Sequence, residues 1–420
     1  MLLLDYGART AEGDVRALSG LANTLLSRFR DTRDIVDIDV GVRLKREVLK
    51  HHPLEHPSRV KAANALASSL YVRFQETGSI SDIDEAISLK REVLEHRAEG
   101  HPDHIESLRD LAVSLLGRSR KTGSIPDIDE AICLKREVLE HCAEGHADYI
   151  KSRQYLAVCL HARSRKTGSI PNIDEAVRLK REVLKHRAEG HPDHIESLRD
   201  LAVSLLGRSR KTGSIPDIDE VIRLEREVLE HRPEGHPHHI GSLRTLAASF
   251  SLRSEATGSI ANLDEAIFLK RAVLEHCPQG HPDHSGSLRS LALSLYLRSV
   301  KTGYIPDIDE AIRLDREVLK HYPQGHQSHA ESLRSLAHSL WFRFLKTEAM
   351  GDLNETIRLE RQVLEQCPPG SHRDRARSLE NLARSLSSLG KRTGAASSHA
   401  EATELNREAR ELHSKSEPTS

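Results

Sequence analysis

Residues 101–145 have the sequence HPDHIESLRDLAVSLLGRSRKTGSIPDIDEAICLKREVLEHCAEG, and variants of this stretch fill most of the 420-residue chain. A Leu-Ala pair inside it marks the period, because its leucine recurs every 45 residues, as Leu21, Leu66, Leu111, Leu156, Leu201, Leu246, Leu291 and Leu336. A ninth copy, Leu382, follows after 46 residues. Self-similarity with a fixed period of this size predicts a solenoid built from repeated supersecondary elements.

The first half of each repeat has the pattern of an amphipathic helix. Asp103, with Glu106 three residues later, has the spacing of a capping box, in which the Asp side chain accepts a backbone N–H and the Glu side chain bonds back to the cap. Steps of three and four residues then place apolar side chains on one helical face: Ile105, Leu108, Leu111, Ala112, Leu115 and Leu116. Gly123 is expected to end this helix, because glycine accepts the left-handed conformation of a helix C-terminus.

The second half of the repeat has the same signals. Asp127 is expected to cap a second helix, with Glu130 three residues later. The buried face of this helix is predicted to carry Ile128, Ala131, Ile132, Leu134, Val138 and Leu139. The helix is expected to stop near residues 143–145, and no segment of the repeat has the alternating pattern of a strand. Each repeat is therefore predicted to be a pair of helices, and the chain an all-α solenoid.

Residue types at fixed positions of the repeat resemble the tetratricopeptide (TPR) signature. The matching positions are Leu108, Leu111, Ala112 and Leu115 in the first helix, Ala131 and Val138 in the second, and a Pro/Ala column with Ala143, Pro53, Pro233, Pro278, Pro323 and Pro368. The usual TPR has about 34 residues, so this repeat is longer, by about seven residues in the turn within the pair and about four between pairs. The resemblance covers about residues 14–413 and implies a right-handed α-solenoid of about nine TPR-like helix pairs.

The longer repeat also contains LRSLALSLYLRSVKTG, DIDEAIRLDREVL and GHPDH, which look like the TPR arrays of basidiomycete fungi. In that family the arrays are commonly joined to a caspase-like CHAT domain or to a NACHT-type NTPase. The resemblance therefore implies a link to such a signalling system, although TPR arrays as a fold bind many unrelated ligands.

The repeats also predict how the chain is organised. An N-terminal remnant is expected over residues 1–13, the solenoid over residues 14–413, and a disordered tail over residues 414–420. The second helix of the last repeat, about residues 396–412, is polar, as a terminal repeat must be in order to cover the last apolar face.

Composition limits the function classes. The net charge is −1 with 30% charged residues, whereas a nucleic-acid-binding domain is expected to be distinctly basic. No run approaches the roughly 20 apolar residues that a membrane-spanning helix needs. The cysteines form no C-x-x-C pair, which indicates reduced thiols and a cytoplasmic location: Cys133, Cys142, Cys159, Cys277 and Cys367. We therefore expect no nucleic-acid or membrane partner.

The histidines form two columns. One has the spacing His-x-x-His, as His101/His104, His191/His194, His236/His239, His281/His284 and His326/His329. Such pairs could ligate a divalent metal, but a role in organising the loop is favoured, because two repeats break the motif, as His146/Tyr149 and His56/Arg59. The other column ends each second helix, where a histidine suits the exposed carbonyls: His51, His96, His141, His186, His231, His276 and His321.

An arginine stands near the end of the first helix in eight repeats, as Arg28, Arg73, Arg118, Arg163, Arg208, Arg253, Arg298 and Arg343. Its recurrence in diverged repeats predicts a structural ion pair with a second-helix carboxylate, such as Asp129 or Glu130. The sequence contains neither a G-x-S-x-G motif nor a P-loop. We therefore expect neither an enzyme nor a bound cofactor.

The TPR resemblance implies that ligands bind on a concave face, through residues of the first helices. One column on this face holds five arginines: Arg109, Arg199, Arg244, Arg289 and Arg334. The forked guanidinium group suits carboxylates and backbone carbonyls. The same predicted face carries Tyr296, His338, Trp341 and Phe342. The sequence leaves open whether these arginines only pair with acidic neighbours on adjacent repeats, such as Asp110.

These features favour a protein-interaction scaffold that binds a protein or peptide segment, acidic and with apolar anchors. A second hypothesis is a detached sensor or scaffold arm of a fungal CHAT- or NACHT-type signalling or innate-immunity system, whose partner would be a CHAT- or NTPase-bearing chain. A third hypothesis is a metal-dependent enzyme that uses the His-x-x-His loops.

Overall fold

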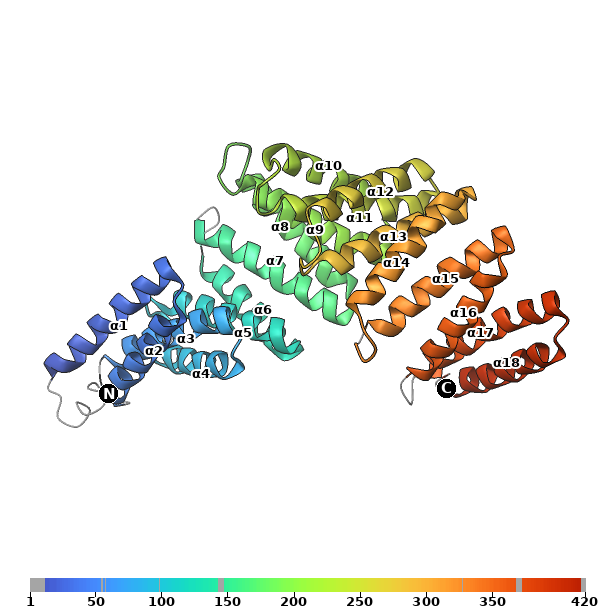
Figure 1. Cartoon of the computed structure of the whole chain (residues 1–420). Helices are drawn as coiled ribbons and strands as arrows, with labels where there is room; N and C mark the ends of the chain where they lie inside the picture. Colours follow the sequence, from blue (N-terminus) through green and yellow to red (C-terminus); the bar gives the residue numbers. More distant parts are fainter. Residues whose placement is uncertain are drawn as a thin grey trace. The chain divides into compact units, whose positions relative to one another are not determined.

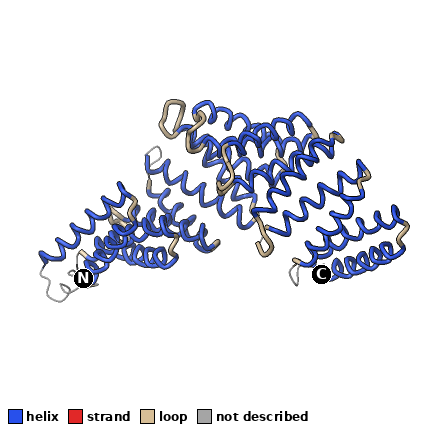
Figure 2. Tube along the Cα trace, viewed as in Figure 1, coloured by secondary structure: helices blue, strands red, loops and turns tan. Residues whose placement is uncertain are grey.

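The computed structural model describes residues 12–53, 56, 58–97, 99–142, 147–326, 328–367 and 372–416. These residues form eighteen helices in regular pairs, and no strand occurs among them (Figure 1). Short loops and turns join the helices (Figure 2). The structure therefore confirms the all-α fold of paired helices that the period predicts.

The chain divides into two compact units, unit 1 (Met1–Thr212) and unit 2 (Gly213–Ser420). Unit 1 contains α1 (Glu12–Thr32), α2 (Ile35–Lys50), α3 (Arg59–Thr77), α4 (Ile80–His96), α5 (His104–Thr122), α6 (Ile125–His141), α7 (Ala147–Thr167), α8 (Ile170–His186) and α9 (His194–Thr212). Unit 2 contains α10 (Ile215–His231), α11 (His239–Thr257), α12 (Ile260–Glu275), α13 (His284–Thr302), α14 (Ile305–His321), α15 (His329–Thr347), α16 (Met350–Glu365), α17 (His372–Thr393) and α18 (Ala396–Ser416). Odd-numbered helices are the first helices of the repeats, and even-numbered helices are the second helices.

Within each unit the helices pack in chain order. In unit 1, α3 packs on α4 of its own pair and on α2 of the preceding pair, and α5 and α7 repeat this arrangement. In unit 2, α11, α13 and α15 do the same. The leucine of the Leu-Ala pair lies in these contacts and is buried in every pair from α3 onward. Because a fully buried leucine stabilises a fold by about 1.5–3 kcal/mol, this column is a main source of the stacking energy.

The turn within a pair is built by a glycine and a serine. Gly123 has a φ of 76°, and its N–H donates to the Ser119 carbonyl at 2.8 Å, so it closes α5 as predicted. Ser124 is the N-cap of α6, and its hydroxyl accepts the Asp127 N–H at 3.3 Å. The predicted cap at Asp127 is therefore wrong. Pro126 lies in the first turn of α6, and this helix starts before Asp127.

Asp127 instead belongs to a partly buried ion pair with the recurrent arginine. Arg118 Nε and Nη2 donate to the two Asp127 oxygens at 2.7 and 2.8 Å, and Arg118 Nη1 donates to Asp84 of the preceding pair at 2.8 Å. The arginine therefore connects two second helices through one bidentate and one single bond. The same three bonds recur at Arg73, Arg298 and Arg343.

The structural role predicted for this arginine column is thus confirmed, but the carboxylate within its own pair is Asp127 and not Asp129 or Glu130. Asp129 accepts a bond from Arg163 of the next pair at 2.5 Å. The spacing of 34 residues between these two groups places their bond between pairs.

The predicted capping box of the first helix is also wrong. Asp103 is the N-cap residue of α5, but its side chain makes no capping hydrogen bond. Its backbone, with φ −93° and ψ 7°, is not in the extended conformation that aims an N-cap side chain at the first turn. The Asp103 carboxylate instead lies 3.2 Å from Arg97 Nη2.

At the C-terminal end of unit 2, α18 packs along α17 and buries Ala402 and Ala409. A mostly polar helix therefore covers the last apolar face. The helix continues to Ser416, three residues into the segment expected to be disordered, and residues 417–420 lie outside the described residues. The expected remnant over residues 1–13 also lies outside them, except for residues 12 and 13 at the start of α1.

Candidate functional site

In unit 1 both arginines of the predicted ladder bind carboxylates of this chain. Arg109 Nη1 lies 2.9 Å from Asp148 Oδ1 on the next pair, and Arg199 Nη1 lies 3.3 Å from Glu196 Oε1 one turn earlier on α9. Pairing with acidic neighbours therefore occurs at these two positions, although not with Asp110.

In unit 2, Arg244 and Arg289 also bind carboxylates of the next pair. Arg244 Nη2 lies 2.9 Å from Asp283 Oδ2, and this contact lowers the pKa of Asp283. Arg289 Nη1 lies 2.6 Å from Glu331 Oε2. All four side chains are open to solvent, from 29% at Arg289 to 66% at Glu331. Exposed ion pairs contribute only about 0–1 kcal/mol, so a partner's carboxylate can replace the internal one at low cost.

Apolar and aromatic groups continue this surface along α13. Arg289, Leu293 and Tyr296 are spaced by four and three residues, which places them on one face of the helix. Leu293 is 53% exposed, and the Tyr296 ring meets the Phe342 ring of α15 edge to face, with 5.9 Å between centroids. We call Arg244, Arg289, Leu293, Tyr296 and Phe342 the first-helix face of unit 2.

Trp341 occupies in α15 the repeat position that Tyr296 occupies in α13. Its ring is partly buried and packs on a core cluster that contains Phe344, Leu353, Ile357, Leu382 and Leu386. The Trp341 and Phe344 ring centroids are 5.6 Å apart. The side chain therefore contributes to the packing of the last pairs.

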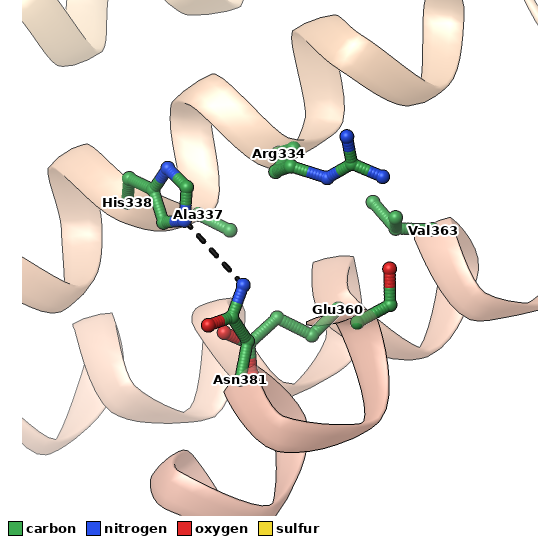
Figure 3. Close-up of a pocket in the computed structure, with 7 residues that line it drawn as sticks. Arg334, Ala337, His338, Glu360, Val363 and Asn381 are labelled. Carbon is green, nitrogen blue, oxygen red and sulfur yellow. Dashed lines mark hydrogen bonds between the residues drawn. The ribbon is translucent and has the colours of Figure 1, made fainter. Parts of the chain in front are cut away.

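Arg334 and His338 line a small polar hollow between α15, α16 and α17 (Figure 3). The hollow has a volume of about 10 Å³, room for roughly one water molecule. Asn381 Nδ2 lies 3.5 Å from His338 Nε2. Arg334 Nε and Glu360 Oε2 are buried, and neither has a hydrogen-bond partner among the described residues. Sequence reasoning found Arg334 and His338 but missed Glu360 and Asn381.

The hollow changes the titration of its ionisable groups. Burial raises the pKa of Glu360 to about 7, against the opposing effects of Ser385 and Arg384. Burial, together with Arg377, Arg334 and Arg384, lowers the pKa of His338. At neutral pH the imidazole is therefore uncharged, and the carboxyl group lies near the midpoint of its titration.

Glu360 belongs to a buried ionisable column that sequence reasoning also missed. One position of each second helix before α18 carries a charged residue, in chain order Lys45, Lys90, Lys135, Lys180, Glu225, Lys270, Asp315 and Glu360. The sequence contained the signal for this column. In each of these second helices, the charged residue directly follows a leucine of the apolar face and precedes a valine of that face by three residues. A helix with 3.6 residues per turn places it on the buried face.

The members of this column bond to the first helix of the next pair. Lys90 Nζ donates to the Asp110 carbonyl at 3.0 Å and to Ser114 Oγ at 2.7 Å. Asp315 accepts bonds from Ser335 Oγ and Ser339 Oγ at 2.9 and 3.0 Å. Burial lowers the pKa of Lys135 to about 8 and of Lys270 to about 8, and raises that of Asp315 to about 6.

The His-x-x-His pairs organise the loops between helix pairs, as predicted. His101 Nδ1 accepts the Asp103 N–H at 3.0 Å, and His104 Nδ1 lies 2.6 Å from the Arg97 carbonyl. The other four pairs repeat both contacts. In the part of the chain that the structure describes, no group of three or more His, Cys, Asp or Glu side chains is arranged to hold a metal ion.

Two members of the second histidine column contact helix-end carbonyls, as expected. His96 Nδ1 lies 2.9 Å from the Glu92 carbonyl, and His231 Nδ1 lies 3.0 Å from the Glu227 carbonyl. All five cysteines are free thiols. Among the helices described, none is long and apolar enough to cross a membrane.

Comparison with known proteins supports the fold. No protein-family model and no curated protein matches this chain. A STAND protein (signal transduction ATPase with numerous domains) with a tetratricopeptide repeat sensor, from Pyrococcus horikoshii, matches 97% of this chain and 53% of its own, with a TM-score of 0.61 and 11% identity. Kinesin light chain TPR-like repeats from Podospora anserina match 54% of this chain and 100% of their own, with a TM-score of 0.38 and 21% identity. The match to the STAND protein, which spans almost the whole chain, shows that the chain has a TPR-like solenoid fold.

Proposed function

We propose that this protein is a non-catalytic interaction scaffold whose first-helix face in unit 2 binds a protein segment with acidic residues and one or two apolar anchors. One observation carries the proposal: Arg289, Leu293 and Tyr296 form a continuous stripe on α13 in which a cation, an exposed leucine and an aromatic ring follow one another. Arginine and tyrosine are among the residue types that dominate binding hot spots.

The charged part of the face would bind by exchange. A partner carboxylate replaces Glu331 at Arg289, or Asp283 at Arg244, and both internal carboxylates are at least half exposed and return to water. Because one exposed ion pair replaces another, the net gain from each exchange is small, and its main effects are orientation and rate of association. Binding should weaken with salt, since exposed charges are screened beyond about 8 Å at physiological ionic strength.

The apolar part would supply most of the affinity. Leu293 is 53% exposed, so covering it recovers about half of the 1.5–3 kcal/mol that full burial of a leucine contributes. The edge-to-face pair of Tyr296 and Phe342 offers a rigid aromatic wall beside it. An apolar side chain of the partner, one or two turns from its acidic residue, fits this arrangement.

The other residues predicted for binding have different places in the proposal. Arg109 and Arg199 occupy the same column in unit 1 and would form an equivalent face there. Arg334 and His338 border the polar hollow, and Trp341 packs on the core cluster of the last helix pairs. A cytoplasmic location is proposed from the five free thiols.

The test uses a display library of random 12-residue peptides selected on the full chain. We expect enrichment of Asp or Glu together with Leu, Phe or Trp. The double variant Arg244→Glu/Arg289→Glu should weaken the selected peptides at least about tenfold, a change of about 1.4 kcal/mol. The matched control is Arg271→Glu/Arg316→Glu, because these arginines also bind a carboxylate of the next pair, at 2.7 and 2.8 Å, but lie on second helices.

Two results would contradict the proposal. If the selected peptides show no preference for acidic residues, Arg244 and Arg289 do not bind carboxylates of a partner. Equal loss of binding in the two double variants would show that general charge reversal, and not the first-helix face, causes the effect.

A second candidate is a sensor or scaffold arm that works with a CHAT- or NTPase-bearing chain. Its support is the fold likeness to the Pyrococcus horikoshii STAND protein, which carries a tetratricopeptide repeat sensor. If the chain co-purifies with an NTPase-bearing partner and the variant Arg244→Glu/Arg289→Glu does not, the first-helix face of unit 2 binds that partner and both candidate functions use the same face. Co-purification that survives this variant would place the arm function on another surface.

A further inference from the structure

Three first helices of unit 1 carry an exposed pair of cations at the same end. An Arg-Lys pair stands near the C-terminus of α5, α7 and α9: Arg120-Lys121, Arg165-Lys166 and Arg210-Lys211. All six side chains are exposed, and none of them forms an ion pair with a carboxylate of the described residues. We call these six residues the basic edge of unit 1.

The lysines connect the three helix ends into one continuous edge, because they reach back to the preceding pair. The Lys166 ammonium group lies 3.1 Å from the position that a Cβ atom at Gly123 would take, directly after the end of α5. Lys211 Nζ donates to the Ser164 carbonyl near the end of α7 at 2.6 Å. The charges of the basic edge therefore follow one another across successive pairs.

The fold leaves this charge without an internal counterion. The recurrent arginines at the same end of the pairs each bind a carboxylate of the preceding second helix, as Arg118–Asp84, Arg163–Asp129 and Arg208–Asp174. These carboxylates are already engaged, whereas the basic edge consists of like charges. Like charges repel one another and destabilise the compact state. A bound anion would relieve this repulsion, so the basic edge has the character of a binding surface.

The packing of the repeat does not require an Arg-Lys pair at these two positions. The other pairs of helices have different residues there: Arg30-Asp31, Gln75-Glu76, Glu255-Ala256, Val300-Lys301, Leu345-Lys346 and Lys391-Arg392. In the last of these, Arg392 binds Glu348. Those pairs stack in the same way as α5, α7 and α9, so a structural role does not account for the row of unpaired cations.

We propose that the basic edge of unit 1 binds a polyacidic protein segment, an extended run of aspartates and glutamates that needs no apolar anchor. His161 Nδ1 of α7 lies 3.0 Å from Ser204 Oγ of α9, so successive first helices are direct neighbours. Neighbouring helices pack about 8–10 Å apart, so the three helix ends cover about 16–20 Å, which about six extended residues span. Each arginine can donate two parallel hydrogen bonds to one carboxylate. This inference is independent of the first-helix face of unit 2.

A polyacidic segment fits the basic edge better than a nucleic acid or a membrane does. Single-stranded nucleic acids bind where open aromatic rings accompany the cations. The exposed aromatic ring on these helices, that of Tyr155, already has Lys135 Nζ 4.8 Å from its centroid. A membrane presents its charge as a plane, whereas the lysines of the basic edge lie back along the preceding pair and form a line.

The test measures the anisotropy of a rhodamine-labelled decaglutamate peptide titrated with the full chain in about 50 mM salt, where screening is weaker than at physiological ionic strength. We expect saturable binding that the variant Arg120→Gln/Arg165→Gln/Arg210→Gln weakens at least about tenfold. The matched control is Arg43→Gln/Lys61→Gln/Lys151→Gln. It removes the same charge from exposed positions of unit 1 that also form no ion pair among the described residues, and it should bind within about twofold of the parent.

Four outcomes would overturn the proposal. The first is a titration of decaglutamate that does not saturate, and the second is an equal loss of affinity in the two triple variants with native helicity. The third is loss of decaglutamate binding in Arg244→Glu/Arg289→Glu, which would assign the peptide to the first-helix face of unit 2. The fourth is tighter binding of oligothymidine or of phosphatidylserine vesicles than of decaglutamate, lost in the arginine variant, which would assign the edge to a nucleic acid or a membrane.

Discussion

Glu360→Gln should stabilise unit 2 at pH 8.5 and change little at pH 5. Glu360 is 7% exposed, and its Oε2 has no hydrogen-bond partner among the described residues. Burial raises the pKa of this carboxyl group from 4.5 to about 7. Between these values the folded state holds a proton that the unfolded state has released, so stability falls as the pH rises through this window. Above pH 7 the folded state carries a buried and incompletely solvated charge.

The magnitude follows from the pKa difference. At about 1.4 kcal/mol for each pKa unit, the charged carboxylate costs the folded state on the order of 3 kcal/mol above pH 7. Glutamine keeps the shape of the side chain and removes the charge. Because glutamine also alters the contact with Ser385, the expected stabilisation is about 2–3 kcal/mol at pH 8.5 and below about 1 kcal/mol at pH 5.

The assay is urea unfolding followed by tryptophan fluorescence. Trp341 is the only tryptophan of the chain, and it packs with Ile357, Leu382 and Leu386 close to the hollow, so its emission reports the last helix pairs. The control is Glu365→Gln, an exposed position on the same helix. Other titrating groups cancel when variant and parent are compared at the same pH. A Glu360→Gln midpoint that exceeds the parent equally at both pH values would refute the argument, as would no change at either.

Three further predictions test the roles assigned to Lys135, Arg118 and Ser124. Lys135→Met should stabilise unit 1 by about 2–3 kcal/mol at pH 7, and the gain should disappear above pH 10.5. The reason is that burial lowers the pKa of Lys135 to about 8, so the charged ammonium group destabilises the folded state below that pH. Thermal unfolding of the variant and the parent between pH 7 and pH 10.5 would measure this gain. Arg118→Met should lower stability by about 3–5 kcal/mol, because Asp127 is left buried without its bidentate partner, and adding Asp127→Asn should recover much of the loss in the same melts. In urea unfolding, Ser124→Ala should lower stability by about 1 kcal/mol and Asp103→Ala by less than about 0.5 kcal/mol, because of these two residues only Ser124 makes a capping bond. A larger loss for Asp103→Ala than for Ser124→Ala would show that Asp103 does cap α5.

The fold was predictable because the period fixes it. A leucine that returns every 45 residues, with apolar neighbours at steps of three and four, leaves few alternatives to stacked helix pairs. The burial of this leucine in every pair from α3 onward confirms the prediction. The caps were not predictable in the same way. Asp127 has the spacing of a capping residue, but an aspartate near a helix start can equally bind a distant arginine, and the sequence does not show that Arg118 lies beside it.

The candidate site was predictable only in part. The column that contains Arg244 and Arg289 was found by its repetition. The carboxylates that these two arginines bind lie 39 and 42 residues further along the chain, so the pairing could be seen only in the structure. The buried ionisable column was missed because a charged residue normally counts against burial. Lysine can bury its hydrocarbon stem while its ammonium group reaches a polar partner, and for Lys90 that partner is the Asp110 carbonyl on another helix.

The buried column also shows how near-identical repeats can acquire different properties. In unit 1 the column is lysine at Lys45, Lys90, Lys135 and Lys180, and burial lowers the pKa of each, so deprotonation at high pH relieves the folded state. In unit 2 the acids Asp315 and Glu360 have raised pKa values, near 6 and 7, so protonation at low pH relieves it, with Lys270 acting in the opposite sense. Contacts in a solenoid join only neighbouring repeats, so these effects stay local. Changing one residue per repeat can therefore set which part of the array loses stability as the pH changes, while the packing leucines stay the same.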